Sequence, residues 1–348
     1  MSKGKNEEER MTAVSFALAG ALVACAALLG GGNAAAADPL KIRIGWIVTP
    51  QELSPLMFAK EGVARHNGIS YTVENVHFQG STLQMAAIQS GDLEIAALGS
   101  NSFPIAVENA GMTDLRIIAD EVQDVAGWNG PDYRVLKDGP IKTIEDLKGK
   151  VVATNVYGGV SDIAVRAMML KHGMVVNRDY TDIEAPMPTM SAVLLEHKAD
   201  LVNAVHPFDL DPDYVAKSRV LFTTPDALGT FEVSMWAART GFIAAHRAEL
   251  TDLLEDYVRA FHWYLDPANR AEAVQIVSRI TKVPVATYDS WLFLPQKGIY
   301  YDHNARPNLD AVTANIHEEH ELGLVKEDLD ARKYADLSLL EAAIARVK

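Results

Sequence analysis

The order of apolar and polar residues predicts an α/β protein, because short apolar strands alternate with helical segments along the chain. Residues Leu40–Trp46 alternate, with Ile42 and Ile44 on one face, which is the period of a strand with one buried side. Residues Tyr71–Phe78 alternate in the same way, and Leu93–Leu98 is an apolar run interrupted only by Glu94. Each of these strands ends in a polar or glycine-containing loop, and we expect a helix after each loop.

Signals for the start of a helix follow the first two strands in the sequence. Ser54 is followed by proline, which is typical of a first helical turn and predicts a helix over residues 54–65. Ser81 and Gln84 have the spacing of a capping box, in which each side chain bonds to the backbone of the other. This pair predicts a helix over residues 82–90.

The most informative stretch covers residues 148–208 and has the pattern of a strand–helix–strand unit. Val151–Ala153 is a short apolar strand, and the pair Gly158–Gly159 predicts a tight turn before a capped helix. A second apolar strand, Leu201–Val205, is ended by Pro207, because proline cannot continue a central ladder. Ligands of open α/β sheets bind outside the carboxyl ends of the strands, so we expect a ligand site at these two strand ends.

Two passages between domains follow from the remaining pattern. The irregular, glycine-containing segment 122–136 is interpreted as the first passage, and the alternating strand Phe231–Ala238 is interpreted as the return. We therefore expect a discontinuous first domain of residues 38–127 and 238–348 and a second domain of residues 128–237.

After the return strand the pattern is helical to the end of the chain. Helices are expected over residues 271–280, 310–322 and 337–347, with prolines between them as breakers. The most regular amphipathic stripe comprises Leu250, Leu253, Leu254, Tyr257, Val258, Phe261, Tyr264 and Leu265.

Composition narrows the possible functions. The chain has 348 residues, 49% of them hydrophobic, which is enough for a large core and favours two domains. Its formal net charge is −14 at pH 7. An acidic surface without a cluster of lysine and arginine repels phosphate backbones, so we expect no nucleic-acid partner.

Residues 1–37 have the pattern of an export signal rather than of a folded segment. The alanine-rich apolar run from Met11 to Leu29 follows three basic residues, and Ala35–Ala37 form an A-x-A cleavage pattern before Asp38. We expect cleavage after residue 37, which leaves 348 − 37 = 311 residues. A membrane anchor is the alternative, but the run is short of the ~20 strongly apolar residues that a span prefers.

The only cysteine, Cys25, leaves a second interpretation of this segment open. It follows Leu22, Val23 and Ala24 and so resembles the lipobox of bacterial lipoproteins, in which the thiol carries a lipid. The apolar run continues past Cys25, whereas a lipobox normally closes it, and for this reason we favour cleavage after Ala37. We expect a periplasmic protein.

Several segments together resemble the periplasmic solute-binding proteins of ABC importers. They are the strand lead-in Leu147–Ala153, the glycine loop behind it, His206–Phe208, the segment Gln89–Ala96 and the loop Gly99–Ser102. Their order and spacing are similar to the nitrate/sulfonate/taurine group, which includes binders of thiamine precursors. The resemblance covers the chain from about Ile42 to its end.

The resemblance implies a type II periplasmic-binding-protein fold, in which two α/β domains joined by two crossover strands close over a ligand. It also implies that the C-terminal helices complete the first domain. A small-molecule ligand and the permease subunits of a membrane ABC transporter are the implied partners, and we expect a monomer without cofactor or metal. Where many relatives have an aromatic and an acidic residue, this chain has Val205–His206, which concerns the ligand more than the fold.

We expect the ligand site where strand-end loops open helices, because free N–H groups at helix N-termini bind anions without a formal positive charge. The serines at these positions can instead cap their own helices, so no single serine predicts a ligand contact. We expect an anion site because several such loops converge. The expected ligand-binding residues are Trp46, Gln79, Gly80, Ser81, Gly99, Ser100, Asn101, Ser102, Trp128, Tyr157, Gly158, Gly159, Ser161, Asn203, His206 and Glu232.

The aromatic members of this set suggest a ligand with an apolar body. Trp46 can equally continue the core face of its strand, and His206 can either donate to a carboxylate or sulfonate or simply close a strand end. Because basic residues are scarce in the loops, we expect a sulfonate or taurine-like organic anion rather than a multiply charged one. An aromatic carboxylate or a pyrimidine is the alternative ligand.

Enzyme motifs are missing from the sequence. It has neither the G-x-x-x-x-G-K-[ST] phosphate loop nor the G-x-S-x-G nucleophile elbow, and the expected cleaved chain has no cysteine. His317 and His320 are three residues apart, whereas the zinc-protease motif needs four. We expect a binding protein and not an enzyme, with an enzyme of the same fold as the second alternative.

Overall fold

The computed structural model describes residues 38–128, 130–296 and 298–347. The expected export signal, residues 1–37, therefore lies outside the described residues, as does Cys25. Residues 39–348 group into one compact unit. Within the described ranges, no helix combines the length and the apolar character that crossing a membrane requires.

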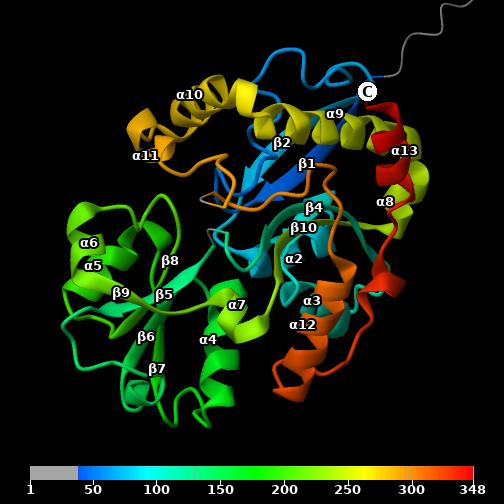
Figure 1. The fold of residues 1–348 in the computed structure, drawn as a ribbon. Helices are drawn as coiled ribbons and strands as arrows, with labels where there is room; N and C mark the ends of the chain where they lie inside the picture. Colours follow the sequence, from blue (N-terminus) through cyan, green and yellow to red (C-terminus); the bar gives the residue numbers. More distant parts are fainter. Residues whose placement is uncertain (1–37, 129, 297, 348) are drawn as a thin grey trace, which may run out of the picture. The chain divides into compact units, whose positions relative to one another are not determined.

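Two five-stranded sheets form the framework of this unit (Figure 1). The first has the order β2-β1-β3-β10-β4, with β1 Leu40–Trp46, β2 Tyr71–His77, β3 Ile95–Leu98, β4 Leu115–Asp124 and β10 Phe231–Arg239. The second has the order β7-β6-β8-β5-β9, with β5 Asp132–Leu136, β6 Val151–Thr154, β7 Thr181–Glu184, β8 Leu201–Ala204 and β9 Ser218–Thr223. We call the first sheet with its helices lobe A and the second sheet with its helices lobe B.

Both sheets have the same pairing pattern. Their first three strands are parallel, and the fourth strand in each order, β10 or β5, runs antiparallel to its neighbours on both sides. The chain enters lobe B after β4 and returns to lobe A at β10. The strand that completes each sheet therefore comes directly from the opposite lobe.

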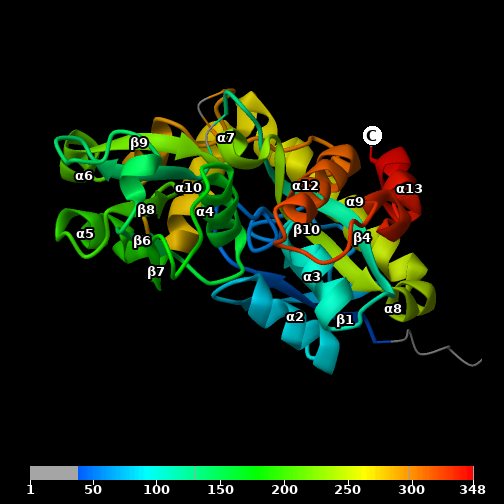
Figure 2. The same ribbon diagram turned by 90° about the horizontal axis from the view of Figure 1, so that it is seen from below.

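Helices cover the sheets. Figure 2 shows β6–β9 with α4, α5 and α6 on the left and most elements of lobe A on the right, with α10 of lobe A overlapping lobe B in this view. The helices of lobe B are α4 Val160–Lys171, α5 Met190–Leu195, α6 Pro212–Lys217 and α7 Thr224–Leu228. Those of lobe A are α2 Ser81–Ser90, α3 Ser102–Asn109, α8 Thr240–Ala245, α9 Arg247–Leu265, α10 Arg270–Thr281, α11 Val285–Asp289, α12 Leu309–Glu321 and α13 Ser338–Arg346.

The core of lobe A follows the predicted alternation of its strands. Ile42 and Ile44 are fully buried and pack with the stripe of α9, whereas Leu98 faces the opposite side of the sheet with α2, α3 and α12. Trp236 of β10 stacks on Tyr257 of α9 with ring centroids 4.0 Å apart. The C-terminal helices thus complete lobe A, as the resemblance implies.

The core of lobe B is smaller and lies on both faces of its sheet. Tyr133 of β5 stacks on Phe222 of β9 with centroids 4.3 Å apart and packs with the buried face of α4. On the other face, Leu194 of α5 and Tyr214 of α6 pack against β8. The division into the domains 38–127 with 238–348 and 128–237 stays a prediction, although each lobe has its own sheet and its own core.

The helix expected over residues 54–65 is wrong, because this segment consists of successive turns. The Leu56 carbonyl accepts from the Tyr264 hydroxyl at 2.8 Å, and the Ala59 carbonyl accepts from Arg279 at 3.5 Å. Side chains of α9 and α10 therefore take carbonyl groups that a helix would use internally. Tertiary packing replaces the helical ladder here.

The capping box at the start of α2 is also wrong. The N-cap is Gly80, and it carries no side-chain cap bond. The Gln84 side chain is fully buried and accepts the Ala97 N–H at 2.8 Å, which ties α2 to the edge of β3. The end of the helix is confirmed, because Gly91 caps it in the left-handed conformation with φ 81°.

Candidate functional site

The larger of two adjoining cavities, about 440 Å³, lies where strands of both sheets end. We call it the body cavity. Lobe A contributes the segments that follow β1 and β2 in the sequence, and lobe B contributes those that follow β6, β7 and β8. The α10–α11 region adds a third wall. The lining residues are Trp46, Ile47, Val48, Thr49, Pro55, His77, Phe78, Gln79, Asn155, Pro186, Met187, Pro188, Pro207, Phe208, Ile280, Thr281, Val283 and Tyr288.

The body cavity is mostly apolar and aromatic. Trp46 lies against His77 with ring centroids 4.5 Å apart, and Phe208 and Tyr288 add two further rings to the wall. Among the described residues, no lysine or arginine lines it. Such a wall suits the hydrocarbon or aromatic part of a ligand and holds no formal positive charge.

The smaller cavity, about 60 Å³, shares Ile47, Val48, Asn155 and Met187 with the body cavity. We call it the head cavity. Two helix N-termini line it: Gly80 and Ser81 open α2 of lobe A, and Gly159, Val160 and Ser161 open α4 of lobe B. The remaining lining residues are Gln51, Glu52, Val122, Pro131, Val156, Val205 and Val233.

Neither of these helices uses a side chain as its N-cap. The N-caps are Gly80 and Gly159, and neither makes a side-chain cap bond. Ser161, expected as a possible cap, donates instead to Asn155 at 2.9 Å. Asp162 accepts the Gly158 N–H at 2.8 Å, in front of the helix. The positive ends of two helix dipoles therefore meet at one small cavity, an arrangement that favours an anionic group.

Asp162 weakens this positive end only in part, because Arg166 is paired with it. The Arg166 side chain bonds to both oxygens of Asp162, at 2.8 and 2.9 Å, and to Asp182 at 2.8 Å. Burial raises the pKa of Asp162, although the arginine opposes this effect. The pair holds the α4 loop in place.

A group of buried acids lies behind the head cavity. Glu52 lines the cavity itself, and Glu121 and Asp120 lie on β4 and Glu232 on β10. Burial raises the pKa of Glu52 and Glu232 well above the ordinary range and that of Glu121 and Asp120 to about 7. Burial therefore favours the protonated form of all four carboxyl groups.

Six of the expected site residues line the two cavities. Trp46 and Gln79 line the body cavity, and Gly80, Ser81, Gly159 and Ser161 line the head cavity. The other ten do not line either cavity: Gly99, Ser100, Asn101, Ser102, Trp128, Tyr157, Gly158, Asn203, His206 and Glu232. Ligand contact by any of the sixteen stays a prediction.

Three expected residues of lobe A make internal or interlobe contacts. Ser100 donates to the Glu232 carbonyl at 3.1 Å, and the Glu232 side chain accepts the Asn308 N–H. Asn101 donates to the Gly158 carbonyl at 3.1 Å and so joins the two lobes.

In lobe B, Tyr157 is 44% exposed, and its hydroxyl bonds to the Asp182 carbonyl at 3.2 Å. His206 has its Nδ1 2.7 Å from Asp209 Oδ1 and lies edge-on to Trp291. Trp128, on the passage between the lobes, packs edge-on against Tyr300 with centroids 5.3 Å apart.

Several residues that line the cavities were not predicted from the sequence. Ile280 and Tyr288 belong to C-terminal helices, and nothing in their pattern distinguishes a cavity wall from a core. Glu52 lies in a loop and Met187 at the start of a short 3-10 helix, Met187–Thr189, and neither segment has a recognisable motif. Phe208 is the exception, because it belongs to the His206–Phe208 motif that carried the resemblance.

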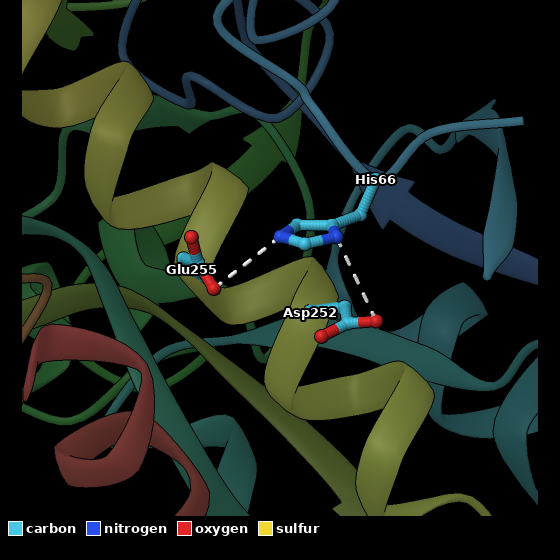
Figure 3. Close-up of side chains that lie close together, drawn as sticks. All are labelled: His66, Asp252 and Glu255. Carbon is cyan, nitrogen blue, oxygen red and sulfur yellow. Dashed lines mark ion pairs between the residues drawn. The ribbon is translucent and has the colours of Figure 1, made fainter. Parts of the chain in front are cut away.

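A second cluster of side chains lies away from both cavities. Figure 3 shows His66 between Asp252 and Glu255 of α9, with its Nδ1 3.8 Å from Asp252 and its Nε2 3.3 Å from Glu255. These residue types can hold a metal ion. However, the two ring nitrogens face different carboxylates, and Arg346 and Arg259 already pair with Asp252 at 2.9 Å and Glu255 at 2.5 Å. We interpret the cluster as an ion-pair network that attaches the loop before β2 to α9.

Each sheet contains one strand, β5 or β10, that the chain reaches directly from the opposite lobe. These two strands and the cavities at the strand ends define a type II periplasmic-binding-protein fold. A profile of the NMT1-like family matches residues 35–278, and the chain belongs to this family. No curated protein matches the sequence at a significant level.

Solved structures with this fold include both binding proteins and an enzyme. The alkanesulfonate-binding protein of Xanthomonas axonopodis pv. citri bound to MOPS is similar with a TM-score of 0.65 and 17% identity over 87% of this chain and 100% of that chain. The periplasmic nitrate-binding protein of Synechocystis PCC 6803 gives 0.65 and 19% over 88% and 89% of the two chains. A desulfurization enzyme gives 0.59 and 13% over 88% and 99%.

Proposed function

We propose that the protein is an extracytoplasmic solute-binding receptor of an ABC importer. In this role it is exported with cleavage after Ala37, binds one small organic anion between its lobes and delivers it to the membrane permease subunits as a monomer. The family, the fold and the cavity between the two sheets support the proposal. Ligand binds the closed arrangement better than the open one and so shifts the population towards closure.

The proposed ligand has a single sulfonate-like head and an apolar body. The convergence of the α2 and α4 N-termini on the head cavity is the observation that carries this proposal. The adjoining body cavity provides the apolar wall for the rest of the molecule. A multiply charged anion such as phosphate is disfavoured, because no lysine or arginine among the described residues lines either cavity.

Two alternatives are each favoured by one observation. The rings of Trp46, Phe78, Phe208 and Tyr288 favour an aromatic body, as in an aromatic carboxylate or a pyrimidine. The similarity of the fold to a desulfurization enzyme keeps enzymatic turnover as the second alternative. Calorimetry with hexanesulfonate, benzenesulfonate, benzoate, an aminopyrimidine and phosphate separates the ligands, and analysis of the recovered ligand detects turnover.

A substitution at the start of α2 tests the helix-end site directly. Ser81 is the first helical residue, where proline is tolerated, and Gly80 before it is extended with ψ 171°, as a residue before proline should be. Ser81→Pro therefore removes one backbone N–H donor while leaving the helix in place. A hydrogen bond to a charged group contributes about 1.5–3 kcal/mol, so we expect hexanesulfonate to bind about 10- to 150-fold more weakly.

Ser81→Ala is the matched control, because it removes the hydroxyl and keeps the backbone N–H. We expect its affinity for hexanesulfonate to stay within a few fold of the wild type. Equal affinities of both variants and the wild type would place the anion elsewhere. Tight binding of benzoate or the aminopyrimidine alone would reject the sulfonate ligand while retaining the receptor role.

A further inference from the structure

We infer that Glu52 and Glu121 form a proton-dependent charge selector behind the head cavity, so that an organic sulfonate binds together with one proton. The inference rests on the proposed function, because it assumes that the anionic head occupies this cavity. It adds a regulation by pH that the helix N-termini alone do not provide, since backbone N–H groups do not titrate.

Glu52 is the ionisable side chain that stands directly at the head cavity. It is only 4% exposed, and its carboxylate accepts the Ile47 N–H. Ile47 itself lines both cavities, which places this carboxyl group at their junction. An ionised Glu52 would repel an anion in a cavity of about 60 Å³, whereas a protonated Glu52 would not.

Glu121 makes the second half of the selector. It is fully buried on β4, accepts the Ser234 hydroxyl at 2.7 Å, and leaves its Oε1 without a hydrogen-bond partner among the described residues. Glu121 precedes Val122 and Ser234 follows Val233, and both valines line the head cavity, which places this hydrogen-bonded pair directly behind the cavity that Glu52 lines. Two adjacent buried carboxyl groups cannot both ionise without a cation beside them.

The groups around the pair supply no such cation. Burial raises the pKa of Glu121, and Ser54 from the loop after β1, Trp236 from β10 and Tyr257 from α9 oppose this effect without carrying a positive charge. The polar side-chain atoms of these three residues have no hydrogen-bond partner among the described residues. Tyr301, on the segment before α12, and Asp120, on β4, also lie near the pair, because the Glu121 charge adds to burial in raising the pKa of both. All of these groups are neutral or acidic, and the pair must therefore be discharged by protons.

The sign of the coupling follows from these surroundings. Burial and the Glu121 charge raise the pKa of Glu52 well above its ordinary range, and burial raises the pKa of Glu121 to about 7. Around that pH the ligand-free pair loses a proton, and at higher pH an arriving anion takes one back from the solvent. Because the coupling of two ligands is reciprocal, affinity for the anion falls as pH rises, by up to about tenfold per pH unit for one proton.

Calorimetry of hexanesulfonate binding between pH 5.5 and 8.5 tests the inference. The charge of this strong-acid anion is constant over that range, so any change in affinity reports on the protein. We expect constant affinity at the acidic end and a loss that approaches tenfold per pH unit above about pH 7. Titrations in two buffers with different ionisation enthalpies should show uptake of about one proton at pH 8.

Variants distinguish the pair from other buried acids. Glu52→Gln keeps a carbonyl acceptor for Ile47 and cannot ionise, so we expect it to bind hexanesulfonate more tightly than the wild type at pH 8.5 and with a flatter pH profile. Glu121→Gln should flatten the profile in the same way. Glu319→Gln is the matched control, because Glu319 is buried with a raised pKa on α12 and lines neither cavity. Its profile should follow the wild type.

The outcomes separate the inference from the proposed function. Tight hexanesulfonate binding with a flat wild-type profile and no proton uptake overturns the inference and leaves the receptor role intact. An affinity that increases with pH also overturns it, because it shows that ionisation of the carboxyl groups does not oppose binding of the anion. If hexanesulfonate does not bind at any pH, the sulfonate ligand itself is wrong. If the glutamine variants fail to fold, proton uptake by the wild type still decides.

Discussion

At the scale of single residues, glycines let the two lobes meet at the cavity. A Cβ at Gly80 would lie 2.7 Å from Val156 Cγ1, and one at Gly99 would lie 2.8 Å from Val160 Cγ2. Asn101 adds a hydrogen bond of 3.1 Å to the Gly158 carbonyl in the same region. Lobe A therefore presents bare backbone to two valines of lobe B, and a side chain at these positions would hold the lobes apart.

We expect Gly80→Ala to weaken ligand binding while changing the melting temperature little. Gly80 is extended with φ 176°, so alanine meets no backbone strain, and the added methyl collides with Val156 only when the lobes are together. Overpacking costs about 1–3 kcal/mol, which corresponds to about 5- to 150-fold in affinity if the cost falls on the closed arrangement. Calorimetry with hexanesulfonate and thermal unfolding measure the two effects.

The double variant Gly80→Ala/Val156→Ala should regain much of the lost affinity, because it removes the methyl group that collides. Gly241→Ala is the control, since a Cβ there meets nothing within 4 Å and its position is helical. A sharp fall in melting temperature for Gly80→Ala with unchanged affinity would show that Gly80 serves folding rather than closure.

The candidate site could be predicted from the sequence only in part. The sequence predicted four of the lining residues, because a glycine or serine directly after a strand marks a helix start. They are Gly80, Ser81, Gly159 and Ser161. Asn101 has the same local signal, but its side chain is used in an interlobe hydrogen bond. Local pattern indicates which loops reach the strand ends, whereas the lining of a cavity depends on how distant segments pack.

At the scale of elements, the strands and long helices follow the sequence closely because one face of each is buried. The α9 stripe shows this: Leu250, Tyr257 and Phe261 are fully buried. The helix prediction for residues 54–65 was wrong because carbonyl groups of this segment bond to side chains of α9 and α10 more than 200 positions away in the sequence. A pattern that is local in sequence cannot reveal such partners.

Glu319 on α12 makes stability depend on pH. It is fully buried, neither of its carboxyl oxygens has a hydrogen-bond partner among the described residues, and burial raises its pKa to about 8 from an ordinary value of 4.5. The folded protein therefore holds a proton that the unfolded chain releases as pH rises above about 4.5. This stability is present at low pH and is lost progressively up to about pH 8.

We expect Glu319→Gln to be more stable than the wild type at pH 8, by on the order of a few kcal/mol, with the difference shrinking towards pH 4.5. The amide cannot ionise, so it does not favour the unfolded chain at high pH. Urea unfolding of both proteins across this range measures the difference. Parallel stability curves would show that Glu319 is solvated or paired in solution.

At the scale of the whole molecule, the chain crosses between the lobes at two places. Side chains of the two lobes are also in contact at a few further positions. The crossings lie between β4 and β5 and between α7 and β10. Outside the cavity region, Asn315 of α12 donates to the Leu228 carbonyl at 2.7 Å, and Lys171 of α4 pairs with Glu318. Two crossings and a limited set of polar and apolar contacts are weak restraints compared with the separate cores of the lobes, which is the arrangement that permits hinge motion.

We expect ligand to shorten the distance between the lobes. Leu83 on α2 and Val215 on α6 are 51% and 48% exposed and line neither cavity, so spin labels at Leu83→Cys and Val215→Cys report on the lobes without disturbing the site. Saturating hexanesulfonate should shorten the mean label distance by more than about 2 Å and narrow its distribution, because ligand selects the closed arrangement. The experiment uses the chain that begins at Asp38, in which no native cysteine competes for the label.

The pair Val215→Cys/Val220→Cys lies within lobe B and should show no change, which controls for effects of ligand on the labels themselves. In the Gly80→Ala background, the long distances should persist at ligand concentrations that close the wild type, because the added methyl opposes contact with Val156. Tight hexanesulfonate binding with an unchanged distance distribution between the lobes would mean that the ligand enters a cleft that is already closed. The glycine contact would then serve rigidity rather than a hinge.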